Sequence, residues 1–193
     1  MQPRIQMTSI DVIASALEPV TPALGRTSSP DGAVTLMLSD IADAADAARE
    51  LGAERWEQLL ADHHLLVEQL LARHDGQVLK FEADGFLASF QSAHAGLHAA
   101  VDLQRTFTAG PSSLAIRVGV HSGFVMGNAD QLMGRNVVLA GRIAAQAKGG
   151  EILVSSSARD YTASDPSLRF EDRGEHHFKG LHGEHEVFAL LWR

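Results

Sequence analysis

Residues 77–90 contain the feature that most restricts the fold, an Asp84-Gly85 pair between two strand-like halves. An aspartate-glycine pair between β-rich runs favours a tight turn, and such a turn joins two neighbouring antiparallel strands. The chain is therefore predicted to form a β-hairpin over this segment. Further strands and helices have to pack beside or on the sheet that this hairpin begins.

Apolar periodicity predicts the other elements. Residues 33–39 form a nearly continuous apolar run that ends at Asp40, which suits a strand covered on both faces, or on one face and by a partner. A long helix is expected next, with Gly76 as its natural stop. The remaining segments are predicted as a helix at 92–107, a strand at 114–126, a small-residue helix at 134–147, a strand at 152–154, a short helix, and strands near 168–179 and 185–192.

This order of elements predicts an α+β sandwich, with helices on one or both faces of a mostly antiparallel sheet. With 193 residues the chain has room for one domain and a short extension. Residues 1–30 hold four of the six prolines and lead into a Ser/Pro/Gly stretch, so they are predicted as a short helix near 9–17 and a linker. The domain itself is expected over residues 31–193.

Charge and composition exclude several classes of function. Lys and Arg number 16 against 24 Asp and Glu, and the net charge of −8 argues against a nucleic acid or an anionic membrane as partner. The absence of cysteine excludes disulfides, thiolate metal sites and thiol nucleophiles. Asp11 and Glu18 interrupt the weakly apolar N-terminal stretch, so neither a signal peptide nor a membrane span is expected, and the chain is predicted to be cytoplasmic.

Two aspartates are candidates for a metal site. Asp40 ends an apolar strand and Asp84 lies at the tip of the hairpin, so neighbouring strands would bring both carboxylates to one edge of the sheet. Two carboxylates repel each other unless a proton or a cation lies between them, and oxygen-only ligands favour Mg²⁺ or Mn²⁺. The alternative interpretation is that Asp84 only forms the turn and Asp40 only caps the following helix.

Six segments in this order and spacing resemble the class III nucleotidyl (adenylate/guanylate) cyclase catalytic domain over residues 31–193. They are VTLMLSDI at 34–41, GQVLKFEADGF at 76–86, RVGVHSG at 117–123, GRNVVLAGRI at 134–143, GGEILVS at 149–155 and FKGL at 178–181. The resemblance implies a ferredoxin-like sandwich of the class III cyclase type. It also implies conversion of a nucleoside triphosphate, with ATP expected, to a 3′,5′-cyclic monophosphate and pyrophosphate.

Residue by residue, the resemblance implies a site shared by two copies in a head-to-tail homodimer. Asp40 and Asp84 match the two aspartates that bind two Mg²⁺ or Mn²⁺ ions, with the Ile41 carbonyl as a further ligand. The residues that match nucleotide contacts are Arg142 at the transition state, Lys179 at the terminal phosphates, Lys80 at the purine and Gln131 as its polar partner.

The sequence departs from the family pattern at three places. Val138 stands where the family has a catalytic asparagine, and valine cannot donate a hydrogen bond. The loop at 41–45 lacks the glycine of the family's phosphate loop, and its Asp43 adds negative charge there. Gln131 replaces the aspartate of the common adenylate type, with Asp130 one residue away. Two functions therefore remain open: a slow, metal-dependent cyclase, or an inactive cyclase-like module for nucleotide binding, dimerisation or regulation.

Overall fold

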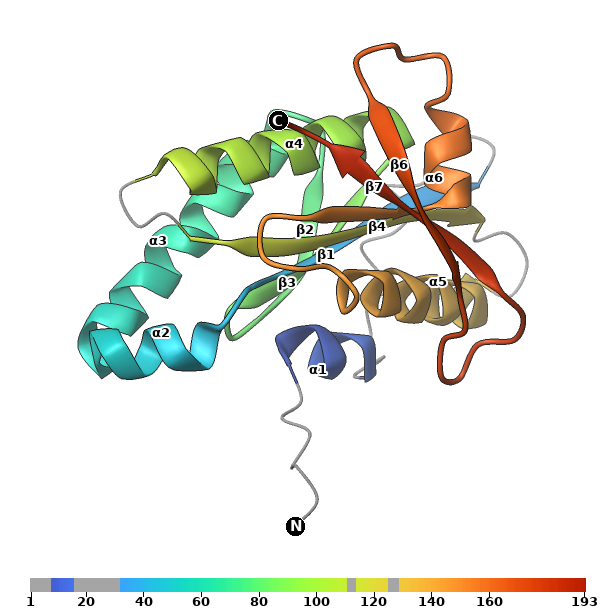
Figure 1. Cartoon of the computed structure of the whole chain (residues 1–193). Helices are drawn as coiled ribbons and strands as arrows, with labels where there is room; N and C mark the ends of the chain where they lie inside the picture. The colour runs from blue at the N-terminus through green and yellow to red at the C-terminus, as the bar shows by residue number, and fades with distance from the viewer. Residues whose placement is uncertain (1–7, 16–31, 111–113, 125–128) are drawn as a thin grey trace.

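The residues that the computed structural model describes, 8–15, 32–110, 114–124 and 129–193, form one seven-stranded sheet with helices on both faces (Figure 1). The helices are α1 (Ser9–Ser15), α2 (Ala44–Leu51), α3 (Ala53–Ala72), α4 (Ala93–Ala109), α5 (Ala129–Ala144) and α6 (Ser156–Tyr161). The strands are β1 (Ala33–Ile41), β2 (Gln77–Glu82), β3 (Gly85–Phe90), β4 (Ile116–Phe124), β5 (Ile152–Ser155), β6 (Arg169–His176) and β7 (His185–Leu191).

The sheet has the order β2-β3-β1-β4-β5-β7-β6. Strand β1 pairs antiparallel with β3 on one side and with β4 on the other, and Asp40 lies opposite Arg117 in the second pairing. Strands β4 and β5 run parallel, whereas β5, β7 and β6 are joined by antiparallel pairings. The predicted α+β architecture with a mostly antiparallel sheet is therefore confirmed.

Strand β1 is buried on both faces, which explains its unbroken apolar sequence. Because successive side chains alternate, Val34, Leu36 and Leu38 enter one hydrophobic cluster. Met37 and Ile41 enter the main cluster on the opposite face. Asp40 shares the parity of the first set, so its side chain belongs to the first face.

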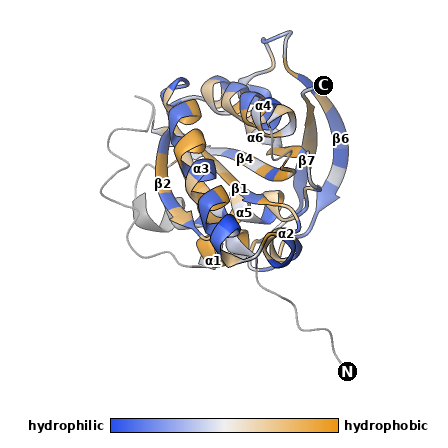
Figure 2. Cartoon of the chain, turned by 90° about the vertical axis from the view of Figure 1, so that its left-hand side faces the viewer, coloured by the Kyte–Doolittle hydropathy of each residue, from blue (hydrophilic) through white to orange (hydrophobic). Residues whose placement is uncertain are grey.

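The two faces of the sheet are covered by different helices. Helices α3 and α4 supply Leu71, Leu97 and Phe107 to the main cluster, whereas α1 and α5 supply Ile13 and Ala140 to the other face. In Figure 1, α4 lies above the sheet and α3 runs along its left-hand side, whereas α1 and α5 lie below it. Figure 2 shows hydrophobic stripes along α3 alternating with hydrophilic ones, as expected for a helix with one buried side.

The hairpin forms as predicted, but its turn differs in detail. Glu82 pairs with Gly85, so Ala83 and Asp84 form the two-residue loop, and the left-handed backbone conformation falls on Ala83 (φ 49°). Gly85 is needed for a different reason. A Cβ atom at Gly85 would lie 2.8 Å from the Ser9 Cβ and 3.0 Å from the Ser39 carbonyl oxygen.

The single long helix predicted after β1 is two helices. Gly52 has φ 78° and ψ 161°, a conformation outside the helical region, and it separates α2 from α3. Helix α3 then ends at Ala72, before the expected stop at Gly76. Gly76 instead allows close packing, because a Cβ there would lie 2.3 Å from the Phe90 ring. The helix predicted at 134–147 begins earlier, at Ala129, and the last two residues of the strand predicted at 114–126 lie outside the described residues.

Helix α5 packs directly on β4 at Gly119. A Cβ atom at this position would lie 2.4 Å from the backbone nitrogen of Ala144. We expect Gly119→Ala to lower the free energy of unfolding by about 3 kcal/mol, because the clash is with helix backbone and cannot be relieved by a rotamer change. Urea denaturation measures this change. A loss below about 0.5 kcal/mol, the size of an ordinary surface effect, would contradict the close packing.

Both edge strands of the sheet have an irregular register and carry charged side chains. The pairing of β2 with β3 shifts register between Val78 and Lys80, and that of β6 with β7 shifts between Asp172 and Glu175. Strand β6 carries charged side chains along most of its length and is largely exposed. Irregular, charged edges of this kind leave few regular backbone groups for another strand to pair with.

His63 is a buried histidine between α3 and α4. It is 2% exposed and stacks on Phe107, and burial lowers its pKa to about 4. The unfolded chain takes up a proton at His63 near pH 6.5, whereas the folded chain does not until about pH 4. Acid therefore favours unfolding over this interval. Relative to His63→Leu, we expect the wild type to lose about 3 kcal/mol of unfolding free energy between pH 7 and pH 4. Parallel urea titrations of the two proteins measure this, and an equal pH dependence would contradict it.

Among the helices that the structure describes, none combines the length and the apolar character that crossing a bilayer requires.

Candidate active site

An acidic pocket lies where β1 ends, beside the β2–β3 hairpin. Its volume is about 390 Å³. Four aspartates and two arginines contribute to its lining, together with residues from α1 and the start of α2. The lining residues are Thr8, Ser9, Asp40, Ile41, Asp43, Ala44, Ala45, Asp46, Arg49, Asp84 and Arg117.

The antiparallel pairing of β1 with β3 brings the two predicted metal-binding aspartates to this pocket. The backbone N–H of Ile41 donates to Oδ2 of Asp84 at 3.2 Å, which ties the hairpin turn to the end of β1. Asp40 and Asp84 are only 1% and 9% exposed. The sequence prediction that two carboxylates meet at one edge of the sheet thus agrees with the structure, whereas their binding of metal stays a prediction.

Asp40 is held by an arginine that the sequence analysis did not single out. Arg117, its cross-strand neighbour on β4, donates from Nε to Oδ1 at 2.8 Å and from Nη2 to Oδ2. This two-point contact is the strong, planar arrangement that guanidinium and carboxylate groups form. The Arg-Val-Gly-Val run indicates a strand, but only the register with β1 shows that its arginine faces Asp40.

Asp84 also accepts a hydrogen bond, from a residue that is far away in the sequence. The hydroxyl of Ser9 in α1 donates to Oδ1 of Asp84, although the two residues are 75 positions apart. Nothing in the sequence of residues 1–30 pointed to this contact. Asp40 and Asp84 therefore both have hydrogen-bond donors within the chain.

The loop after Asp40 contains a left-handed backbone conformation at a residue that is not glycine. Asp43 has φ 55° and ψ 29°, a left-handed conformation that asparagine, aspartate and glycine adopt more readily than other residues. Its backbone carbonyl accepts from the N–H groups of Asp46 and Ala47, which starts α2. The side chain of Asp43 is exposed at the pocket, where it adds the negative charge expected from the sequence.

Helix α5 presents Val138 and Arg142 on one side. Residues four positions apart on a helix share a face, and both side chains are partly exposed, whereas Val137 and Ala140 are buried toward the sheet. Gln131 lies near the start of the same helix, and its side chain is outside the part of the structure that is described.

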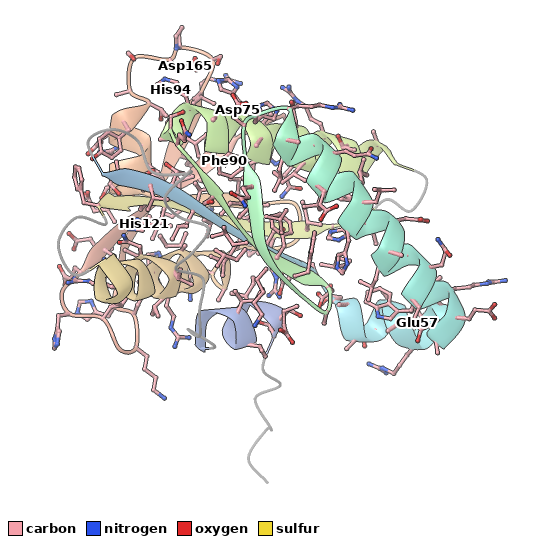
Figure 3. All side chains as sticks on the ribbon, turned by 180° about the vertical axis from the view of Figure 1, so that it is seen from behind. Glu57, Asp75, Phe90, His94, His121 and Asp165 are labelled. Carbon is pink, nitrogen blue, oxygen red and sulfur yellow. The ribbon has the colours of Figure 1, made fainter. Side chains whose placement is uncertain are left out.

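The asparagine nearest to Val138 does not replace the missing donor. Asn136 donates to the Phe124 carbonyl at 3.1 Å, and its Oδ1 lies 3.2 Å from Nε2 of His121. Figure 3 shows His121 beside α5 on the sheet. Burial lowers the pKa of His121 to about 4, so its ring is neutral at physiological pH. The Asn136 amide is thus committed to β4 rather than to the outer side of α5.

The remaining predicted site residues lie apart from the pocket. Lys80 is on the edge strand β2 and pairs with Glu82 at 3.1 Å. Lys179 is exposed in the connection between β6 and β7. Among the described residues that line the acidic pocket, Lys80, Arg142 and Lys179 do not appear. One chain therefore brings together Asp40, Ile41 and Asp84, whereas Lys80, Arg142 and Lys179 lie outside the lining of this pocket.

The donor set of the pocket suits a hard divalent cation. Within the described residues, no group of three or more histidine, aspartate or glutamate side chains is arranged to hold a metal ion. Mg²⁺ and Mn²⁺ sites often use only one or two carboxylates, with water and substrate phosphates as the other ligands. Two buried carboxylates beside an open 390 Å³ pocket fit that pattern.

Comparison with known proteins identifies the domain type. Residues 27–191 match the family model described as the adenylate and guanylate cyclase catalytic domain. A protein of Rhizobium meliloti (strain 1021), provisionally named adenylate cyclase 3, is 31% identical over 144 residues, which cover 72% of this chain. The chain spans 23% of that relative's length.

Two solved structures show the same fold. The adenylyl cyclase CyaB from P. aeruginosa superposes with a TM-score of 0.72 at 22% identity, covering 82% of this chain and 93% of that one. The guanylate cyclase domain of RhGC from Catenaria anguillulae, solved in complex with GTP, gives a TM-score of 0.72 at 18% identity, covering 83% and 97%.

Proposed function

Because the chain belongs to the adenylate and guanylate cyclase catalytic domain family, we propose that it cyclises a nucleoside triphosphate, with ATP as the expected substrate. In this reaction the 3′-hydroxyl of the ribose loses its proton, and its oxygen bonds to the α-phosphorus. The bond between the α-phosphorus and the bridging oxygen breaks, and pyrophosphate leaves. The products are a 3′,5′-cyclic monophosphate and pyrophosphate.

The observation that carries this proposal is the convergence of Asp40 and Asp84 in one pocket. The bond from the Ile41 N–H to Asp84 fixes the second carboxylate beside the end of β1. Asp40, Asp84 and the Ile41 carbonyl would hold two Mg²⁺ or Mn²⁺ ions. Bound there, such ions lower the pKa of the attacking hydroxyl and offset negative charge on the α-phosphate.

A second copy of the chain is needed to complete the site. The planar guanidinium of Arg142 suits the phosphate oxygens of the transition state, and Lys179 suits the terminal phosphates. Both residues lie outside the lining of the acidic pocket of their own chain. In a head-to-tail dimer, the α5 face of one copy supplies Arg142 to the pocket of the other. Lys80 and Gln131 are proposed to contact the base.

Two features of the site lead us to expect slow turnover. Val138 offers no hydrogen bond to the transition state, and loss of one such donor costs about 10²–10³ in rate. Asp43 places a carboxylate at the pocket where phosphates would bind, and like charges repel there.

The direct test is to incubate the protein with Mn²⁺ and each nucleoside triphosphate and to measure cyclic product. We expect cyclic AMP from ATP, and loss of product in Asp84→Asn, because the variant lacks one charged metal ligand. Asp62→Asn is the matched control, since Asp62 is an exposed carboxylate of α3 that bonds only to Gln58 within the described residues. Equal rates for Asp84→Asn and wild type would refute the proposed site.

A regulatory module is the second candidate function, and the engaged carboxylates favour it. In this conformation Arg117 donates to Asp40 and Ser9 donates to Asp84, so both carboxylates have partners within the chain. Such a module would dimerise and bind nucleotide without turnover. Nucleotide binding with no cyclic product under any metal and nucleotide combination would support it over the enzyme.

A further inference from the structure

Helix α1 packs against the domain through its side chains. Ile10 and Ile13 are 1% and 2% exposed, and they join a hydrophobic cluster contributed by β1, β3 and α5. In Figure 1, α1 lies next to α5 below the sheet. A helix of seven residues is not stable by itself in water, so its place depends on these contacts.

The docked helix reaches the acidic pocket through its first residues. Thr8 and Ser9 line the pocket, and the Ser9 hydroxyl donates to Oδ1 of Asp84. Gly85 makes this approach possible, because any Cβ there would lie 2.8 Å from the Ser9 Cβ and 3.4 Å from Cδ1 of Ile13. The hairpin that carries Asp84 is thus shaped to receive α1.

We propose that α1 is a strap at the wall of the acidic pocket, and that it competes with a divalent cation for Asp84. The proposal rests on the proposed function in one respect, that the pocket takes such a cation. Within this proposal a cation binds Oδ1 of Asp84 in place of the Ser9 hydroxyl, so the docked and metal-bound states oppose each other. Because the two states differ in affinity for the cation, binding shifts the chain toward the undocked one.

Release of the strap leaves the domain intact. The sheet pairings of β1, β2, β3 and β4 do not involve α1, and α5 continues to cover part of the same face. The main hydrophobic cluster lies on the opposite face, under α3 and α4. A change that undocks α1 is therefore expected to free Asp84 from Ser9 without unfolding the sheet.

Thiol labelling tests the competition directly, because the chain contains no cysteine. In the Ile13→Cys protein the only thiol lies on the buried face of α1 and stays covered until α1 undocks. We expect saturating Mn²⁺ to raise its labelling rate about tenfold, the factor for breaking one hydrogen bond to a charged group. Val101→Cys, a thiol buried on α4, is the control for general opening, and its rate is expected to stay constant.

Calorimetry with Mn²⁺ alone provides the second measurement. Ile13→Asp undocks α1 and is expected to bind Mn²⁺ about tenfold more tightly than wild type. Leu65→Asp makes an equivalent change at an exposed position of α3 and is expected to leave the affinity unchanged. Ser9→Ala removes the hydroxyl with α1 still docked and is expected to tighten binding as well.

The results of these experiments distinguish the strap proposal from the proposed cation site. Mn²⁺ binding of equal affinity in wild type, Ser9→Ala and Ile13→Asp, with no change in Ile13→Cys labelling, would overturn the strap and leave the cation site standing. No Mn²⁺ binding by any of these proteins would overturn both the cation site and the strap. Tighter binding in Ile13→Asp together with faster labelling would support the strap, even if no cyclic product forms.

Discussion

Mixing equal amounts of the Asp84→Ala and Arg142→Ala proteins is expected to restore about one quarter of wild-type cyclase activity, because half of the dimers are mixed and each has one intact site. Each variant alone is expected to lose at least about 10²–10³ in rate, the cost of one transition-state donor. The basis is the separation seen in one chain, where the pocket holds Asp84 and Arg142 lies on α5 outside its lining. The measurement is cyclic nucleotide formed by each variant and by the mixture.

The control for this experiment is a mixture of Asp84→Ala with Asp40→Ala. Both substitutions fall in the same pocket, so every site of every mixed dimer lacks one carboxylate. No recovery is expected in this mixture. If the first mixture also failed to recover while all variants still dimerised, the shared site would be wrong.

The Val138→Asn protein is expected to turn over about 10²–10³ times faster than wild type, because the new amide supplies a donor to the transition state. Val138 is partly exposed on the side of α5 that also carries Arg142, and valine and asparagine are close in size. The gain should appear in kcat rather than in KM, since a contact made only in the transition state does not strengthen substrate binding. Steady-state rates under saturating Mn²⁺ and ATP measure it.

Val138→Leu serves as the matched control, because leucine fills the position but cannot donate. Its rate is expected to stay at the wild-type level. Equal rates for wild type and Val138→Asn would show that the missing asparagine does not limit turnover. No product from any of the three, with nucleotide still bound, would favour the regulatory module.

The sequence predicted the elements that bear the pocket because their signals are local. An apolar run ending at Asp40 and a hairpin around Asp84 are both visible within about ten residues, and antiparallel pairing of adjacent strands joins them. The sequence did not predict the break between α2 and α3 at Gly52. The apolar residues that follow Gly52 recur at helical spacing, and this pattern does not show where the helix begins. Local patterns thus identified the strands and helices more reliably than their ends.

The partners of the two carboxylates could not be predicted, because they depend on contacts between distant segments. Arg117 faces Asp40 only in the register that β1 and β4 adopt. Ser9 reaches Asp84 only because α1 docks beside the hairpin, and residues 16–31 give no sequence signal for that position. Periodicity describes which side of an element is apolar, but not which distant polar groups meet across it.

The bulged edges of the sheet have a consequence for how two copies can assemble. Strands β2 and β6 end the sheet, and each has an irregular register and charged side chains such as Lys80 and Asp172. A continuous intermolecular sheet, whether in an ordered dimer or in an aggregate, would need one of these edges to accept a new strand. Irregular register at both edges disfavours strand addition, so two copies are expected to associate through contacts between faces of the domain.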